Sequence, residues 1–98
     1  MKLFIDDVRT PPDNSWHVIR TAEEAIEFLK HNKVDTISFD HDLGEGLTGY
    51  DVIKWMEEQI YTGKLTAPEK MMVHSANPVG KKNIEQAIKS IERYKELI

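Results

Sequence analysis

Short apolar runs alternate along the chain with longer stretches in which apolar residues recur at helical spacing. The segments 2–5 (KLFI), 16–20 (WHVIR), 34–39 (VDTISF) and 70–73 (KMMV) are typical of short strands. Helical spacing of apolar residues predicts helices over about 22–31, over about 49–63, and from 78 onward. The segments between them are rich in Gly, Pro, Asp and Asn, and we expect them to be loops.

Each expected helix has a capping signal at its start. Thr21 with Glu24 forms a capping box, and Thr48 can cap the second helix. Asn77 followed by Pro78 is typical of the start of a helix. In the third helix we expect a buried face made by Ile84, Ala87, Ile88, Ile91 and either Leu97 or Ile98.

Strands that are followed by helices favour a parallel sheet with helices packed on its faces. The direction of the second strand stays open, because only about ten residues separate it from the first, slightly fewer than a parallel crossover usually needs. A strand order of 2-1-3-4 would bring the carboxyl ends of the first, third and fourth strands together. We expect a small α/β sandwich with a mostly parallel four-stranded sheet and about three helices, forming one domain over residues 1–98.

Composition narrows the possible functions. The 98 residues contain no cysteine, which excludes disulfide scaffolds, thiolate metal sites and cysteine nucleophiles. The formal net charge of -4 argues against long nucleic-acid duplexes held by phosphate neutralisation. No stretch approaches the roughly 18 apolar residues of a membrane span, so we expect a cytoplasmic protein.

Acidic residues follow the first and third expected strands. Asp6 and Asp7 end the first, and Asp40 and Asp42 follow the third. Because the carboxyl ends of parallel strands meet at one edge of the sheet, these carboxylates would lie close together and would need a compensating cation. We therefore expect a metal site for a hard divalent ion such as Mg²⁺, held by Asp6, Asp7, Asp40 and Asp42. The alternative is that each acid only ends a strand and caps a loop.

Histidines accompany the acids at the same edge. His41 follows Asp40, and His74 follows the fourth strand. Two imidazoles facing one phosphodiester can act as general base and general acid, so Asp40, His41 and His74 are the candidate catalytic residues. Alternatively, either histidine binds a metal or hydrogen-bonds a carboxylate or backbone group. His17 and His31 have no such neighbours, and we expect them at the surface.

Basic and polar residues at this edge are candidates for binding phosphate. The unpaired amides at the start of the third helix form an anion site, beside which lie Ser75, Asn77 and Lys81. Arg9 could hold a phosphate with two donors. The alternatives are a solvent-exposed helix surface for Lys81 and an ion pair with the neighbouring acids for Arg9.

The acidic pair at 6–7, the segment from Asp40 to Leu43, and Ser75 with Ala76 resemble the receiver domains of two-component response regulators. In that family the pair helps to hold Mg²⁺, the aspartate after strand three accepts a phosphoryl group, and the hydroxyl residue contacts it. The resemblance would give these roles to Asp6 with Asp7, to Asp40 and to Ser75. Receivers also have a helix after the first strand, a fifth strand and a lysine at the end of that strand, and this sequence departs from all three.

A closer resemblance is to a compact receiver-like family that is common in phages and bacteria, the cyclic-phosphate-processing receiver domains. It rests on the segments LFIDDVRTPP, WHVIRTAEEAI, ISFDHDLG, TGYDVIKW and VHSANPVGKKNI, which together cover most of the chain. The histidines within FDHD and VHSANP are its distinctive part. The resemblance implies a role on cyclic phosphate groups.

These patterns together predict a metal-assisted phosphoesterase that opens a cyclic phosphate, either a 2′,3′-cyclic phosphate at an RNA end or a cyclic nucleotide. The alternatives are a non-catalytic module that binds a nucleotide or a protein, and a phosphoacceptor switch on Asp40. The expected partner is a small phosphate-containing ligand or an RNA end, and neither a duplex nor a membrane. We expect a monomer or a weak homo-oligomer.

Overall fold

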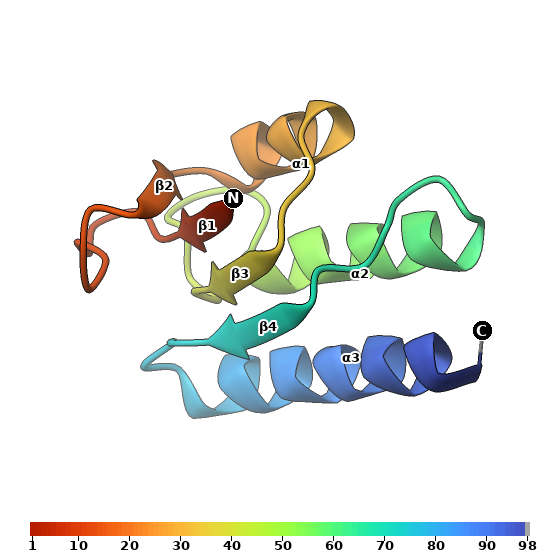
Figure 1. Cartoon of the computed structure of the whole chain (residues 1–98). Helices are drawn as coiled ribbons and strands as arrows, with labels where there is room; N and C mark the ends of the chain where they lie inside the picture. Colours follow the sequence, from red (N-terminus) through yellow and green to blue (C-terminus); the bar gives the residue numbers. More distant parts are fainter. Residues whose placement is uncertain (98) are drawn as a thin grey trace.

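The computed structural model describes residues 1–97, which form one four-stranded sheet and three helices (Figure 1). The strands are β1 (Lys2–Ile5), β2 (Trp16–Ile19), β3 (Thr36–Phe39) and β4 (Lys70–Val73), and the helices are α1 (Ala22–His31), α2 (Gly49–Tyr61) and α3 (Pro78–Leu97). All strand pairs are parallel, in the order β2-β1-β3-β4. The expected fold class is confirmed. The second strand, β2, whose direction the sequence left undecided, runs parallel to β1.

The helices begin where the capping signals predicted. The Thr21 side chain accepts a hydrogen bond from the amide of Glu24, and Thr48 forms a complete capping box with Asp51. The expected buried face of α3 is found at Ile84, Ala87, Ile88 and Ile91. Leu97, however, is 79% exposed and does not belong to that face, and Ile98 lies outside the described residues.

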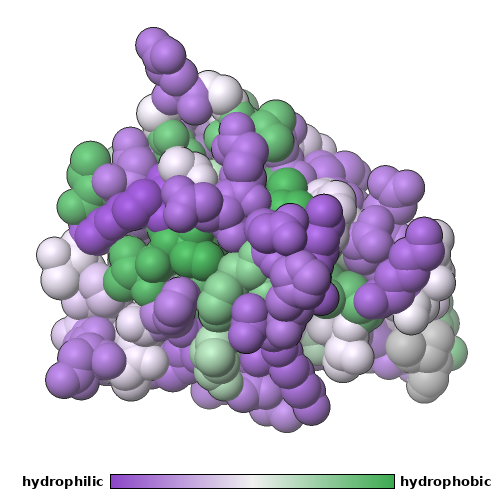
Figure 2. All heavy atoms as spheres, turned by 90° about the horizontal axis from the view of Figure 1, so that it is seen from above, coloured by the Kyte–Doolittle hydropathy of each residue, from purple (hydrophilic) through white to green (hydrophobic). Residues whose placement is uncertain are grey.

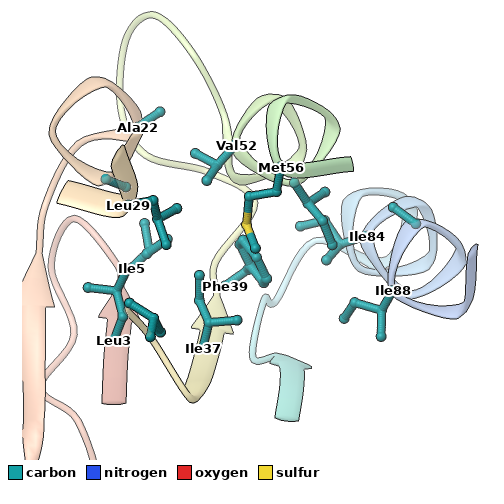
Figure 3. Close-up of a cluster of buried hydrophobic side chains, with 14 of the residues drawn as sticks. Leu3, Ile5, Ala22, Leu29, Ile37, Phe39, Val52, Met56, Ile84 and Ile88 are labelled. Carbon is teal, nitrogen blue, oxygen red and sulfur yellow. The ribbon is translucent and has the colours of Figure 1, made fainter. Parts of the chain in front are cut away.

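The hydrophobic core lies between the sheet and a layer made by the three helices (Figure 3). Leu3 and Ile5 of β1 and Ile37 and Phe39 of β3 point to this layer and are fully buried. The helices contribute Ala22 and Leu29 from α1, Val52 and Met56 from α2, and Ile84 and Ile88 from α3. Because α2 packs against both α1 and α3, the helices form one continuous layer.

The helices cover only one face of the sheet, whereas the alternating pattern suggested helices on its faces. Parallel crossovers are right-handed, so connections that run in the same direction across a sheet lie on the same face. The connections from β2 to β3 and from β3 to β4 share a direction. Only the connection from β1 to β2 runs the other way, and its residues 6–15 form a loop without a helix.

The face of the sheet opposite the core therefore carries no helix in the described part of the chain, and we call it the open face. The strand register places eight side chains on it: Lys2, Phe4, Trp16, Val18, Thr36, Ser38, Lys70 and Met72. Phe4 and Ser38 at its centre are nevertheless buried, because neighbouring side chains cover them. The carboxyl ends of the strands form one edge of this face.

The molecular surface seen in Figure 2 is predominantly hydrophilic, with smaller hydrophobic patches between the charged side chains. Each helix is amphipathic and turns its apolar stripe to the core, which leaves its polar side to water. None of the helices in residues 1–97 has both the length and the apolar character needed to cross a bilayer.

Candidate functional site

The hydrogen-bond ladder of the sheet continues one residue beyond β1, β3 and β4. The amides of Asp6, Asp40 and His74 each donate to the carbonyl of the last residue of the neighbouring strand, at 3.1, 2.9 and 2.9 Å. These bonds fix the backbone of the three residues in one row across the carboxyl edge of the sheet. The sequence prediction that strand ends from distant parts of the chain meet at this edge is therefore correct for these three residues.

Three carboxylates gather at this edge. Asp6, Asp7 and Asp40 each contribute one oxygen to a group in which all oxygens lie within 4.8 Å of one another. We call these residues the acidic cluster. Like charges at such separations disfavour one another, so the cluster favours a bound cation.

Asp6 is the best-supported member of the acidic cluster. Its side chain is fully buried, and Oδ1 accepts hydrogen bonds from the amides of Val8 (2.9 Å) and Arg9 (2.8 Å). Burial alone would raise the pKa of this carboxyl, but these amide bonds and the bond from His74 outweigh it and hold the pKa below its ordinary value. Asp6 is therefore ionised at neutral pH.

Asp40 is buried without such support. The residue is only 6% exposed, yet no group within residues 1–97 donates a hydrogen bond to its carboxylate or forms an ion pair with it. Among residues 1–97 no side-chain oxygen that is shielded from solvent lacks a hydrogen-bond partner, so the carboxylate oxygens of Asp40 reach solvent at this edge and are free to bind a ligand. Carboxylate oxygens are also the ligands that Mg²⁺ prefers. The donor set of the acidic cluster therefore fits a hard divalent cation.

His74 is held on the open face with both ring nitrogens engaged. Nε2 lies 3.0 Å from Oδ2 of Asp6, and Nδ1 lies 2.6 Å from Oγ of Ser38. The ring also stacks on Phe4, with centroids 4.3 Å apart and planes 7° from parallel. A ring clamped in this way has no free nitrogen with which to take up or deliver a substrate proton, so His74 acts on the site through Asp6.

His41 lies on the other side of the sheet edge, against the helix layer. Its ring packs on the first turn of α3 so closely that a Cβ atom added to Gly80 would lie 2.3 Å from His41 Cγ. Nδ1 lies 3.0 Å from Oδ1 of Asp42, and this bond is the main cause that lowers the pKa of the Asp42 carboxyl. When Nδ1 donates to Asp42, Nε2 keeps a lone pair that can accept a proton.

Two sequence expectations are corrected here. His41 and His74 do not face one another, because one ring packs against α3 and the other stacks on the open face. Asp42 was expected among the metal ligands, but it lies outside the acidic cluster and binds His41 and Asn77 instead. Sequence spacing showed that these residues follow strand ends but not to which side each would turn.

The start of α3 provides polar groups beside His41. Asn77 caps the helix, because its Oδ1 accepts from the amide of Gly80 at 3.0 Å. The Oγ of Ser75 accepts from the amide of Asn77 at 3.1 Å, which leaves the hydroxyl proton free to donate. Lys81 does not join this group, since its side chain lines a groove between β4 and the outer side of α3, with Met72 and Glu85.

Arg9 contacts the residues that follow β1 and β4, through an ion pair with the first and a hydrogen bond to the second. Its guanidinium lies 3.7 Å from Oδ2 of Asp6 and donates to the carbonyl of His74 at 2.7 Å. The expected alternative, an ion pair with the adjacent acids, is therefore present. Arg20, which the sequence did not single out, donates to the carbonyls of Asp6 (3.1 Å) and Arg9 (2.7 Å) and so holds the turn 6–9 in place.

The sequence model described as cyclic-phosphate processing receiver domain matches residues 1–90. The chain belongs to this family. No curated protein and no solved structure shows significant similarity to it. The match covers the acidic cluster, both edge histidines and the start of α3, so the arrangement described above is that of a cyclic-phosphate processing receiver domain.

Besides Arg20, two residues of this receiver domain's edge were missed by the sequence reasoning. Ser38 and Phe4 are the partners that fix the His74 ring, one through a hydrogen bond and one through stacking. A signal for Ser38 was available, because it is a polar residue between the apolar Ile37 and Phe39 and buried hydroxyls need a partner. Nothing in the sequence distinguished Phe4 from the core residues on either side of it.

Proposed function

We propose that the chain is a metal-assisted phosphoesterase that hydrolyses a cyclic phosphate. The observation that carries the proposal is the acidic cluster, in which the solvent-accessible carboxylate oxygens of Asp40 have no protein partner among the described residues. Membership in the cyclic-phosphate processing receiver family supports the substrate class. A divalent cation such as Mg²⁺, held by Asp6, Asp7 and Asp40, would supply a Lewis acid for the phosphoryl oxygens.

His41 is the residue that moves protons in this proposal. Nε2 of His41 takes a proton from water while the water oxygen forms a bond to phosphorus, and one ring P–O bond of the cyclic phosphate breaks. The proton then passes from Nε2 to the leaving alkoxide oxygen, which gives a phosphate monoester. Asp42 holds Nδ1 during both transfers, as a carboxylate partner fixes the tautomer and orientation of an imidazole.

The remaining polar groups bind and orient the phosphoryl group. The Ser75 hydroxyl and the amide of Val79, in the first turn of α3, donate hydrogen bonds to phosphoryl oxygens, where negative charge grows in the transition state. The guanidinium of Arg9, which is partly exposed at the same edge, adds a positive charge. His74 and Arg20 keep Asp6 and the turn 6–9 in position.

A phosphoacceptor switch is the second candidate, and one observation favours it: no group within residues 1–97 donates a hydrogen bond to the Asp40 carboxylate, so its solvent-accessible oxygens are free to attack phosphorus. Against it, no lysine within residues 1–97 forms an ion pair with the acidic cluster to neutralise a transferred phosphoryl group. A third candidate, a module that binds a nucleotide without turnover, uses the same phosphate-binding groups.

Incubation with 2′,3′-cyclic AMP, 3′,5′-cyclic AMP and acetyl phosphate, with Mg²⁺ or with EDTA, separates the candidates. We expect hydrolysis of the 2′,3′-cyclic phosphate that EDTA and Asp40→Asn abolish and that His41→Ala slows by about 100-fold or more. His31→Ala is the matched control, since His31 is exposed and remote from the edge, and it should leave the rate unchanged. Binding without product would favour the module, and a stable phosphoryl adduct on Asp40 would favour the switch; either would refute hydrolysis.

A further inference from the structure

The open face differs in chemistry from the rest of the molecule. The chain carries a formal net charge of -4, yet the charged side chains on the open face are Lys2 and Lys70 and include no acid. Of the two carboxylates close to the first residues of these strands, Asp35 pairs with the N-terminal ammonium, whereas Asp13 bonds the neutral Ser15 and keeps its charge near Lys2. The charged strand residues of the open face are therefore all cations on an acidic protein, although Glu85 and Glu92 of α3 line the groove beside Met72.

Aromatic and flexible apolar side chains lie among these cations. The ring of Trp16 is only partly buried, with Phe4 against it edge-on at 5.9 Å and the Lys2 ammonium 4.4 Å from its centroid. On the opposite side of the open face, Met72 is 40% exposed beside Lys70. Surfaces that bind single-stranded nucleic acids combine aromatic rings, on which bases stack, with cationic side chains that pair with the phosphate backbone.

The open face leads directly to the candidate site. Lys2 and Asp6 lie four residues apart along β1 and its extension, which corresponds to about 13 Å in an extended strand. The ring of His74, which binds Asp6, covers Phe4 in the centre of the face. A chain whose terminal phosphate lies at the acidic cluster can thus continue across the open face past Trp16, Lys2 and Lys70.

We propose that the open face binds the single-stranded RNA whose cyclic-phosphate end enters the site at the carboxyl edge. The inference rests on the proposed function for the terminal phosphate and extends it by naming the substrate class: an oligoribonucleotide rather than a free cyclic mononucleotide. Lys2 and Lys70 pair with phosphates upstream of the end, and a base stacks on Trp16. A duplex does not fit this scheme, because its bases are not available for stacking.

The test compares two ligands that both carry a 3′-phosphate and are not turned over: a short single-stranded oligoribonucleotide and the corresponding mononucleotide. Their affinities for the full chain, measured by fluorescence anisotropy and competition in Mg²⁺, should differ by tenfold or more in favour of the oligonucleotide. Trp16→Ala should weaken oligonucleotide binding by about fivefold or more. Lys70→Ala should weaken it and lower the slope of log affinity against log salt by about 0.7, as expected for the loss of one phosphate contact.

Lys82→Ala is the matched control, because Lys82 is also an exposed lysine but belongs to α3 and not to a strand of the open face, and it should change neither quantity. Lys70 is exposed, so its replacement tests the surface even if Trp16→Ala disturbs folding. Equal affinities for the two ligands, or equal effects of Lys70→Ala and Lys82→Ala, would overturn the inference. If the oligonucleotide binds in a Lys70-dependent way but the cyclic phosphate is not hydrolysed, the proposed reaction is refuted and RNA binding by the open face is supported. If the cyclic phosphate is hydrolysed but the oligonucleotide and the mononucleotide bind with equal affinity, the proposed reaction is supported and RNA binding by the open face is refuted.

Discussion

The Nε2 atom of His74 lies 3.0 Å from Oδ2 of Asp6, so that the residue after β4 supports the residue after β1 across the intervening β3. Ser38 of β3 completes the bridge by binding Nδ1 of the same ring. One imidazole therefore connects three strands at the edge where the acidic cluster lies. His74 therefore has a structural place at this edge, with both of its ring nitrogens engaged by protein groups.

Replacing His74 by phenylalanine should destabilise the fold. An aromatic ring at this position keeps the stacking on Phe4 but removes the hydrogen-bond partner of the buried Ser38 hydroxyl and the only hydrogen bond of Asp6 Oδ2, at a cost of about 1–3 kcal/mol. Urea denaturation measures the loss. His31→Phe, on an exposed residue, should stay within about 0.5 kcal/mol of the original protein. Equal effects of the two substitutions would contradict the bridging role.

Gly80→Ala should also destabilise, although alanine normally stabilises a helix relative to glycine by about 1 kcal/mol. The added methyl group would lie 2.3 Å from Cγ of His41, so the ring has to move at a cost of about 1–3 kcal/mol. The double variant Gly80→Ala/His41→Ala removes the clash and should recover most of that cost. Additive losses in thermal or urea unfolding would show that the His41 ring does not lie against α3.

Asp40→Asn should raise the melting temperature in EDTA. It removes one of three mutually repelling charges, and a gain of about 1 kcal/mol corresponds to about 4–8 °C for a domain of this size. Mg²⁺ should then stabilise the original protein but not the variant. Glu69→Gln, on an exposed residue outside the acidic cluster, should alter neither the melting temperature in EDTA nor its response to Mg²⁺. A variant less stable than the original in EDTA would argue against repulsion at the cluster.

Stability should fall in acid, in part through Asp6. Hydrogen bonds hold the pKa of Asp6 below its ordinary value, so its contribution is present above the unfolded pKa of about 3.9 and is lost as pH falls through the lower folded pKa. Asp6→Asn should therefore be less stable at neutral pH and should lose less stability between about pH 6 and about pH 3. Parallel curves of unfolding free energy against pH for the two proteins would contradict this.

Much of the fold could be predicted from the sequence because its signals are local. Thr21 and Thr48 cap helices through bonds to residues only three positions away, and a short apolar run such as Leu3 to Ile5 is enough to specify a buried strand. The meeting of Asp6 with Asp40 followed from strand ends and sheet order. The sequence also showed that the connection between the first two strands has no helix, but not that one face of the sheet stays open, because that follows only once β2 is known to run parallel to β1.

The arrangement of the edge histidines could not be predicted, because it depends on which side of the sheet a residue just beyond a strand turns its side chain. His41 follows β3 by two positions and turns to the helices, where Gly80 leaves room for its ring. His74 follows β4 by one and turns to the open face, where Phe4 and Ser38 receive it. Both positions agree with the alternation of side chains along an extended strand, but this alternation holds beyond a strand end only where the backbone stays extended, which the sequence does not show.

The most direct test of the account is a crystal structure grown with Mn²⁺ and inorganic phosphate. We predict an anomalous peak about 2.2 Å from carboxylate oxygens of Asp6, Asp7 and Asp40, with phosphate density beside it that contacts Ser75 and the amide of Val79 at the start of α3. An acidic cluster that stays free of metal at saturating Mn²⁺, or a metal bound by other residues while the cluster is closed by protein side chains, would contradict the central claim.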